Sequence, residues 1–138
     1  GDSDSLATAK EVYIYTGEGV ILVVDDDKVI RRSTKAMLET CGYQVILAHD
    51  GVEGVEVLKK RHKEIDLVIL DMVMPKLSGN ETFIKMKKIQ KDVKVLLNSG
   101  FRRDNHVEDA LRRGAKGFLK KPYTLEKLSE YVYKILHS

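Results

Sequence analysis

The chain has 138 residues, of which 43% are hydrophobic and 33% are charged, a balance typical of one globular domain with one core. Its net charge of +3 is small, and its basic pairs fall on separate predicted elements without a recognition motif, which favours solvated helix faces over a nucleic-acid interface. The lone cysteine excludes an internal disulfide, and no apolar stretch reaches the roughly 18 residues that span a bilayer.

The first residues differ in composition from the rest of the chain. They are rich in small and polar residues, with a short extended piece expected over 11–15 and a turn or hinge over 16–19. We therefore predict a linker over 1–19 and one folded domain over 20–138.

From residue 20 onward, short apolar runs alternate with helical patterns. The length of these runs and their content of Val, Ile and Leu predict buried parallel strands. The predicted strands cover residues 20–24, 44–48, 66–71, 93–98 and 117–120. The helices between them have clear start signals at Asp27, at Asp104 or Asn105, and at Thr124.

Strands that alternate with helices predict an α/β fold, here a (βα)5 doubly wound parallel sheet of five strands with right-handed crossovers. The common order for five strands is 2-1-3-4-5, and its switch point lies between strands one and three. Ligands bind outside the carboxyl ends of the strands in such sheets. The ends of the runs at 20–24 and 66–71 are therefore the expected location of a site.

Four strand ends carry reactive groups, namely Asp25-Asp26, Asp71, Ser99-Gly100 and Lys121-Pro122. Clustered carboxylates repel one another unless a cation joins them, and oxygen-only ligands suit Mg²⁺. A hydroxyl and a lysine at the same edge can neutralise and bind a phosphoryl group. Asp71 stands alone at its strand end and can act as a nucleophile that forms an acyl phosphate.

Together these motifs resemble the receiver domain of response regulators over about residues 20–138. The matching stretches are VVDD at 23–26, DMVMP at 71–75 with Gly79, LNSG at 97–100 and GAKGFLKKP at 114–122. The resemblance implies a flavodoxin-like fold and a phospho-accepting signalling switch of a two-component phosphorelay.

The resemblance also assigns roles at the acidic edge. It implies that Asp71 is the phospho-acceptor and that Mg²⁺, or Mn²⁺ in its place, is held by Asp25, Asp26, Asp71 and the backbone carbonyl of Val73. Lys121 would pair with a phosphoryl oxygen, and the peptide bond between Lys121 and Pro122 is expected to be cis.

The resemblance also implies two switch residues and a set of residues that lie next to the phosphoryl group. Ser99 is the expected switch hydroxyl, and Phe118 the switch aromatic, without the hydroxyl of a tyrosine. Val73, Gly100 and Phe101 flank the phosphoryl group. Because the Val73 and Phe101 side chains are apolar and cannot orient a water molecule, we expect slow autodephosphorylation.

The expected phosphodonor is a histidine kinase or a histidine-phosphotransfer domain. A downstream partner is expected on the face formed by the fourth helix, the fifth strand and the fifth helix, with no direct contact to nucleic acid or membrane. The stretch 16–19 resembles the join inside a hybrid sensor histidine kinase, so a C-terminal receiver of such a kinase is the expected context. The alternatives are a stand-alone regulator and a receiver cut from a regulator with an output domain. The domain is expected in the cytoplasm, with a parent that can be membrane-anchored. By itself it would catalyse only its own phosphorylation and dephosphorylation.

Two alternatives belong to other functional classes. Residues 25–29, Asp-Asp-Asp-Lys-Val, match the Asp-x-Asp-x-Thr/Val pattern of haloacid-dehalogenase-type phosphatases, in which Asp25 would be the nucleophile. That family places a further acidic pair after its lysine on a late strand, whereas here only Glu126 and Glu130 follow, on a predicted helix. The second alternative is a pseudo-receiver, an interaction module that never takes phosphate.

Overall fold

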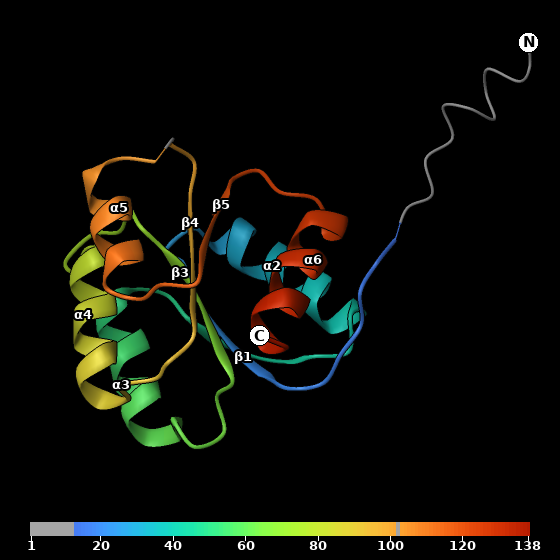
Figure 1. The fold of residues 1–138 in the computed structure, drawn as a ribbon, viewed down its shortest axis with the longest axis horizontal. Coiled ribbons are helices and arrows are strands. Elements are labelled where there is room, and N and C mark those ends of the chain that lie inside the picture. The colour runs from blue at the N-terminus through green and yellow to red at the C-terminus, as the bar shows by residue number, and fades with distance from the viewer. Residues whose placement is uncertain (1–12, 102) are drawn as a thin grey trace, which may run out of the picture.

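The computed structural model describes residues 13–101 and 103–138 (Figure 1), so the expectation for residues 1–12 lies outside the described residues. Its strands are β1 (Val20–Val24), β2 (Gln44–Ala48), β3 (Leu67–Asp71), β4 (Val95–Ser99) and β5 (Gly117–Lys120). Its helices are α2 (Lys28–Thr40), α3 (Gly51–Arg61), α4 (Gly79–Ile89), α5 (Asn105–Arg112) and α6 (Leu125–Leu136). All strand pairs are parallel and the order is β2-β1-β3-β4-β5, which confirms the predicted doubly wound sheet.

The sheet divides the core into two layers (Figure 1). Helices α2 and α6 cover one face, and α3, α4 and α5 cover the other. Alternate residues of each strand point to opposite faces, so Ile21 and Val23 pack towards α2 and α6, whereas Leu22 and Val24 pack towards α3, α4 and α5. Because both faces are covered, the strands are mainly apolar, as the sequence pattern indicated, with polar residues near the strand ends.

Side-chain caps fix where the helices begin. Asp27 accepts hydrogen bonds from the Val29 and Ile30 amides at 2.9 and 3.2 Å, so it caps α2 as predicted. Asp104 and Thr124 cap α5 and α6 in the same way. Strand β4 begins two residues later than predicted, at Val95, because the Val93 amide donates to the Gln90 carbonyl in a turn.

Residues 13–19 differ from the predicted linker because they pack against the folded domain. The Tyr15 amide donates to the Ser129 hydroxyl on α6 at 3.1 Å, and the Gly17 amide donates to the Cys41 carbonyl at 2.9 Å. The Tyr15 ring lies 4.9 Å from the Tyr133 ring, between centroids. The predicted turn at 16–19 is not formed, since these apolar and backbone contacts hold the segment against α2 and α6. The domain boundary at residue 20 stays a prediction.

None of the helices in the described parts of the chain combines the length and the apolar character needed to cross a membrane.

Gly79, the first residue of α4, lets this helix approach the end of β3. A Cβ at this position would lie 2.5 Å from the Met72 Cα and 2.6 Å from the Asp71 carbonyl oxygen. We predict that Gly79→Ala lowers the free energy of unfolding by about 2 kcal/mol, because the helix must move away from the strand that carries Asp71. Urea unfolding measures this change. Gly100→Ala is the matched control, since a Cβ there meets no atom within 4 Å, and equal stability of the two variants would contradict the prediction.

Candidate functional site

Three carboxylates meet at the carboxyl edge of the sheet. Asp25 and Asp26 follow β1, and Asp71 ends the neighbouring strand β3. Each offers an oxygen, and these oxygens lie within 4.8 Å of one another. Asp25 and Asp71 are buried, whereas Asp26 is exposed. The structure therefore brings the sequence-predicted ligands together, and it leaves one side of the group open to solvent.

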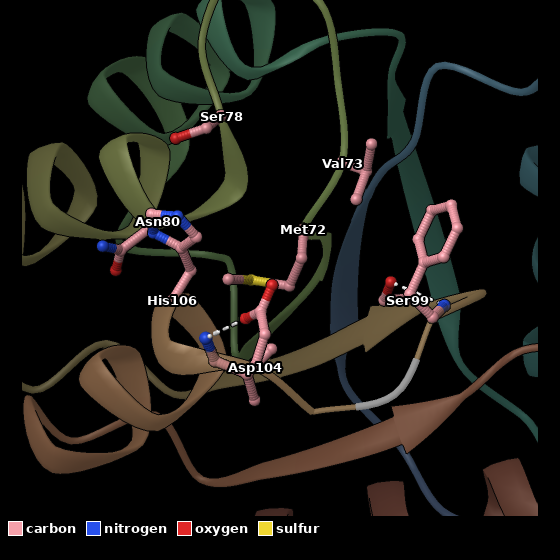
Figure 2. A pocket seen from close by; sticks show the side chains of 9 residues that line it. Met72, Val73, Ser78, Asn80, Ser99, Asp104 and His106 are labelled. Atoms are coloured by element: carbon pink, nitrogen blue, oxygen red, sulfur yellow. Dashed lines mark hydrogen bonds between the residues drawn. The ribbon is translucent and has the colours of Figure 1, made fainter.

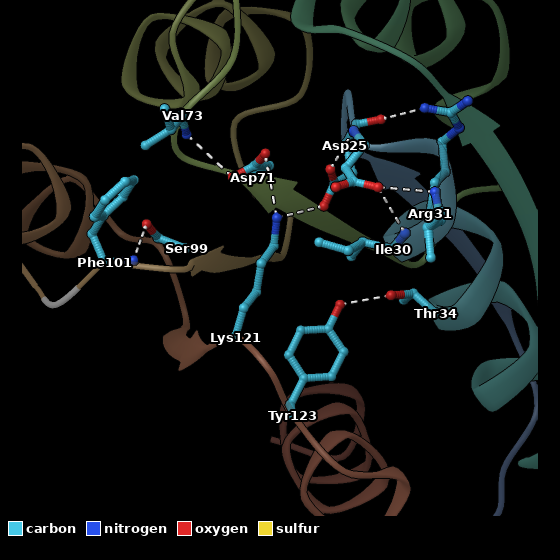
Figure 3. A network of polar contacts seen from close by, with 12 residues as sticks. Asp25, Ile30, Arg31, Thr34, Asp71, Val73, Ser99, Phe101, Lys121 and Tyr123 are labelled. Atoms are coloured by element: carbon cyan, nitrogen blue, oxygen red, sulfur yellow. Dashed lines mark hydrogen bonds and ion pairs between the residues drawn. The ribbon is translucent and has the colours of Figure 1, made fainter.

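Lys121 provides the positive charge within this cluster (Figure 3). Its Nζ lies 2.8 Å from Oδ2 of Asp25 and 3.4 Å from Oδ2 of Asp71. The Lys121–Pro122 peptide bond is cis, as predicted. Burial alone would lower the pKa of Lys121, but the two carboxylates together raise it above its ordinary value, so the side chain is an ammonium.

The carboxyl group of Asp71 is less acidic than usual. Burial raises its pKa to about 6, even though Lys121 and a hydrogen bond from the Val73 amide at 3.2 Å act in the opposite direction. The charge of Asp25 adds to the increase. A cation bound at this edge would therefore favour the ionised form of Asp71.

The raised pKa predicts how the stability of the metal-free protein changes with pH. The folded state favours the protonated form of Asp71. The resulting contribution to the free energy of unfolding is therefore fully present below pH 3.8 and is lost as the pH rises through about 6. This increase in the pKa of Asp71 corresponds to a change of about 3 kcal/mol in the free energy of unfolding. We expect Asp71→Asn to be more stable than wild type at pH 7 in EDTA, with the gap closing towards pH 4. Urea unfolding of both proteins across this pH range measures the difference. A difference in the free energy of unfolding that does not change with pH would contradict the prediction.

Ser99 follows Asn98, the register partner of Asp71, so the Ser99 side chain points to the opposite face of the sheet from the Asp71 carboxylate. The Ser99 hydroxyl accepts a hydrogen bond from the Phe101 amide at 3.0 Å (Figure 3). Gly100 and the side chains of Val73 and Phe101 are exposed, the latter two at 55% and 67%. In the described part of the chain, the Ser99 hydroxyl makes no hydrogen bond to any of the three carboxylates. Ser99 therefore lies near the site but does not contact the carboxylates through a hydrogen bond.

A small cavity of about 150 Å³ opens next to Ser99, between the loops that follow β3 and β4 (Figure 2). Its lining includes Met72, Asn80 and His106. Phe118 is partly buried and packs into the core layer on this same side. The two predicted switch residues, Ser99 and Phe118, therefore share one face of the sheet.

Two contacts at the site were not predicted from the sequence. The Arg31 guanidinium donates to the Asp25 carbonyl at 2.7 Å, and the Tyr123 and Thr34 hydroxyls are hydrogen-bonded at 2.6 Å (Figure 3). Arg31 follows the cap Asp27 by one helical turn, a spacing that could have shown that it reaches back to the strand end. The Tyr123 hydroxyl, just after β5, faces α2, where Thr34 lies.

The donor set fits a divalent cation of the Mg²⁺ type. All three side chains offer oxygen, and the exposed Asp26 leaves room for the water ligands that Mg²⁺ retains. Asp27 is not part of this set, because its carboxylate is used to cap α2.

Comparison with known proteins agrees with this arrangement. The model of the response regulator receiver domain family matches residues 21–133. The chain is 35% identical to chemotaxis protein CheY of Treponema pallidum over 84% of this chain and 81% of that protein. It is 31% identical to the sensor kinase CckA of Brucella abortus over 88% of this chain, but this covers only 13% of that kinase. A receiver domain structure from Clostridium thermocellum superposes with a TM-score of 0.82 at 34% identity, covering 86% of this chain and 94% of that one.

Proposed function

We propose that this chain, which belongs to the response regulator receiver domain family, takes a phosphoryl group on Asp71 from a phosphohistidine donor. Domains of this family are phospho-accepting switches of two-component signalling. The observation that carries the assignment is the Lys121 ammonium, 3.4 Å from Asp71 inside a group of three carboxylates. The three carboxylates and the ammonium leave an excess of two negative charges, which one divalent cation would balance. The cation and the ammonium together would then offer positive charge to an incoming phosphoryl group.

The transfer step follows from the positions of these side chains. An Asp71 carboxylate oxygen attacks phosphorus, an O–P bond forms, and the P–N bond to the donor imidazole breaks, so that the imidazole leaves with its electron pair and is protonated by solvent. Lys121 stays beside the developing charge and pairs with one phosphoryl oxygen. Ser99 turns to hydrogen-bond another oxygen, and Phe118 moves within the same side of the sheet.

Receiver domains generally bind Mg²⁺ at an acidic pocket. We assign the ligands here to Asp25, Asp26, Asp71 and the Val73 carbonyl, with Mn²⁺ as a substitute. When bound, the cation supplies the positive charge that lets the carboxylates accept a further anion.

Receiver domains interact with histidine kinases or phosphotransfer proteins, and we assign one of these as the donor. For the downstream partner we propose the face formed by α5, β5 and α6, with no nucleic acid involved. This face lies over Phe118 and carries the exposed Arg112 and Arg113. Similarity to CckA supports a hybrid sensor kinase as the parent protein, and a cytoplasmic location goes with that proposal.

The function is tested by intact mass after incubation with acetyl phosphate and Mg²⁺. We expect the protein to gain one phosphoryl unit and to gain none in EDTA. No gain with Mg²⁺ would contradict the proposal and favour a pseudo-receiver.

A slow loss of the phosphoryl group is a further prediction. Neither Val73 nor Phe101 can orient an attacking water, so we expect a lifetime of minutes or longer. Val73→Asn should shorten it about fivefold, since one hydrogen bond to water contributes about 1 kcal/mol. The decay is followed by intact mass after removal of acetyl phosphate, with Val73→Leu as the apolar control. A wild-type lifetime of seconds would show that these side chains do not limit hydrolysis.

A further inference from the structure

Asn98 is a buried polar residue within an otherwise apolar strand, and the proposed chemistry gives it no role. It is only 2% exposed, and its Oδ1 has no hydrogen-bond partner among the residues that the structure describes. A buried carbonyl without a partner costs about 1–3 kcal/mol, so native proteins rarely keep one without a use for it. Leucine would continue the run of residues 95–97 at no such cost.

The strand register places this side chain beside the functional cluster. Asn98 is paired with Asp71 on β3 and with Leu119 on β5. Residues in register on neighbouring parallel strands point to the same face, and Leu119 packs towards α2 and α6. The Asn98 amide therefore lies on the face of the carboxylates, and not on the face of Ser99.

Lys121 must pass over this position. It follows β5, whereas its partners Asp71 and Asp25 lie at the ends of β3 and β1, and β4 lies between β5 and β3. Its ammonium has three donors, and its two close partners are carboxylates that a cation would bind. In the loaded site the cation would compete for the carboxylate oxygens, and the phosphoryl oxygen would use only one of the three Lys121 donors, so a donor is left for a neutral acceptor.

We propose that the Asn98 amide oxygen accepts a hydrogen bond from the Lys121 ammonium in the phosphoryl-loaded state, so that Asn98 positions Lys121 against the phosphoryl oxygen. This inference rests on the proposed function, in which Lys121 pairs with the phosphoryl group. A neutral amide suits the role, because it adds an acceptor without adding a fourth negative charge to the edge.

The test is binding of beryllium fluoride, a phosphoryl analogue, in the presence of MgCl2, measured by the rise in melting temperature of the whole chain. Wild type, Asn98→Leu, Lys121→Met and the double variant are compared. We expect Asn98→Leu to melt at the same or a higher temperature without ligands, and to bind beryllium fluoride about tenfold more weakly, as for one charge-assisted hydrogen bond. In the Lys121→Met background, Asn98→Leu should cause no further loss.

The inference is overturned if Asn98→Leu binds beryllium fluoride as tightly as wild type does. It is also overturned if Asn98→Leu weakens this binding by the same factor in the wild-type and Lys121→Met backgrounds, since a purely structural role gives additive effects. If the leucine variant does not fold, Asn98→Ala is read in the same way. Ser129→Ala, which removes a buried hydroxyl on α6 far from this edge, is the matched control and should leave binding unchanged. A wild-type protein that shows no rise at all would instead overturn the proposed function.

Discussion

Asp71→Asn is expected to abolish phosphoryl uptake, so that the intact mass after acetyl phosphate and Mg²⁺ stays that of the unmodified chain. The amide has nearly the shape of the carboxylate but lacks the charge and the nucleophilic oxygen that attacks phosphorus. Asp25 and Lys121, 2.8 Å apart, keep their contact in this variant, so the loss is specific to the acceptor. Because burial raises the pKa of Asp71, replacing its carboxylate by a neutral amide removes an unfavourable buried charge, and we expect the variant to fold stably.

Asp25→Asn is the informative comparison, because a phosphatase-type mechanism would make Asp25 the nucleophile. We expect this variant to lose Mg²⁺ affinity and to recover uptake when the Mg²⁺ concentration is raised. Uptake that survives Asp71→Asn but is lost at all Mg²⁺ concentrations in Asp25→Asn would reverse the assignment.

Lys121→Met is expected to cause the largest loss of stability among the site variants, about 3 kcal/mol in EDTA at pH 7. Lys121 is the cation in contact with two buried carboxylates, and its own side chain is only 12% exposed. Removing one partner of a buried ion pair leaves the other charges without compensation. Methionine keeps the length of the stem, so the loss comes mainly from charge.

Adding Mg²⁺ should reverse most of this loss, because the cation supplies the missing positive charge. The rise in melting temperature with Mg²⁺ is therefore expected to be larger in Lys121→Met than in wild type. Lys120→Met, at the exposed neighbouring position, is the matched control and should respond like wild type. A smaller rise in Lys121→Met would mean that Lys121 helps to form the cation site and does not merely replace the cation.

The fold and the composition of the site were largely predictable from the sequence. Apolar runs at residues 20–24 and 67–70 can only be buried on both faces, which requires a parallel sheet with helices on each side. With the strand order that is common for five such strands, Asp25 and Asp71 meet at neighbouring strand ends, as the structure shows.

What the sequence did not predict depends on side-chain direction and on long-range packing. The alternation that places Asn98 with the carboxylates and Ser99 with Phe118 becomes visible only when the strand register is known. The contacts of residues 13–19 join this segment to α6, more than a hundred positions away, and no local pattern contains them. Arg31 is an intermediate case, because its spacing of one helical turn from Asp27 indicates where its side chain reaches but does not identify the Asp25 carbonyl as its partner.

The separation of the two core layers by the sheet has an evolutionary consequence. Phe118 and α5 pack in one layer, whereas α2 and α6, which follow Asp26 and Lys121 in the chain, pack in the other. Duplicated copies of such a gene can therefore acquire new partner proteins through substitutions on the exposed surface of α5, while Asp71, Ser99 and Lys121 stay unchanged. New signalling pairs can arise in this way while the phosphoryl-accepting site is retained.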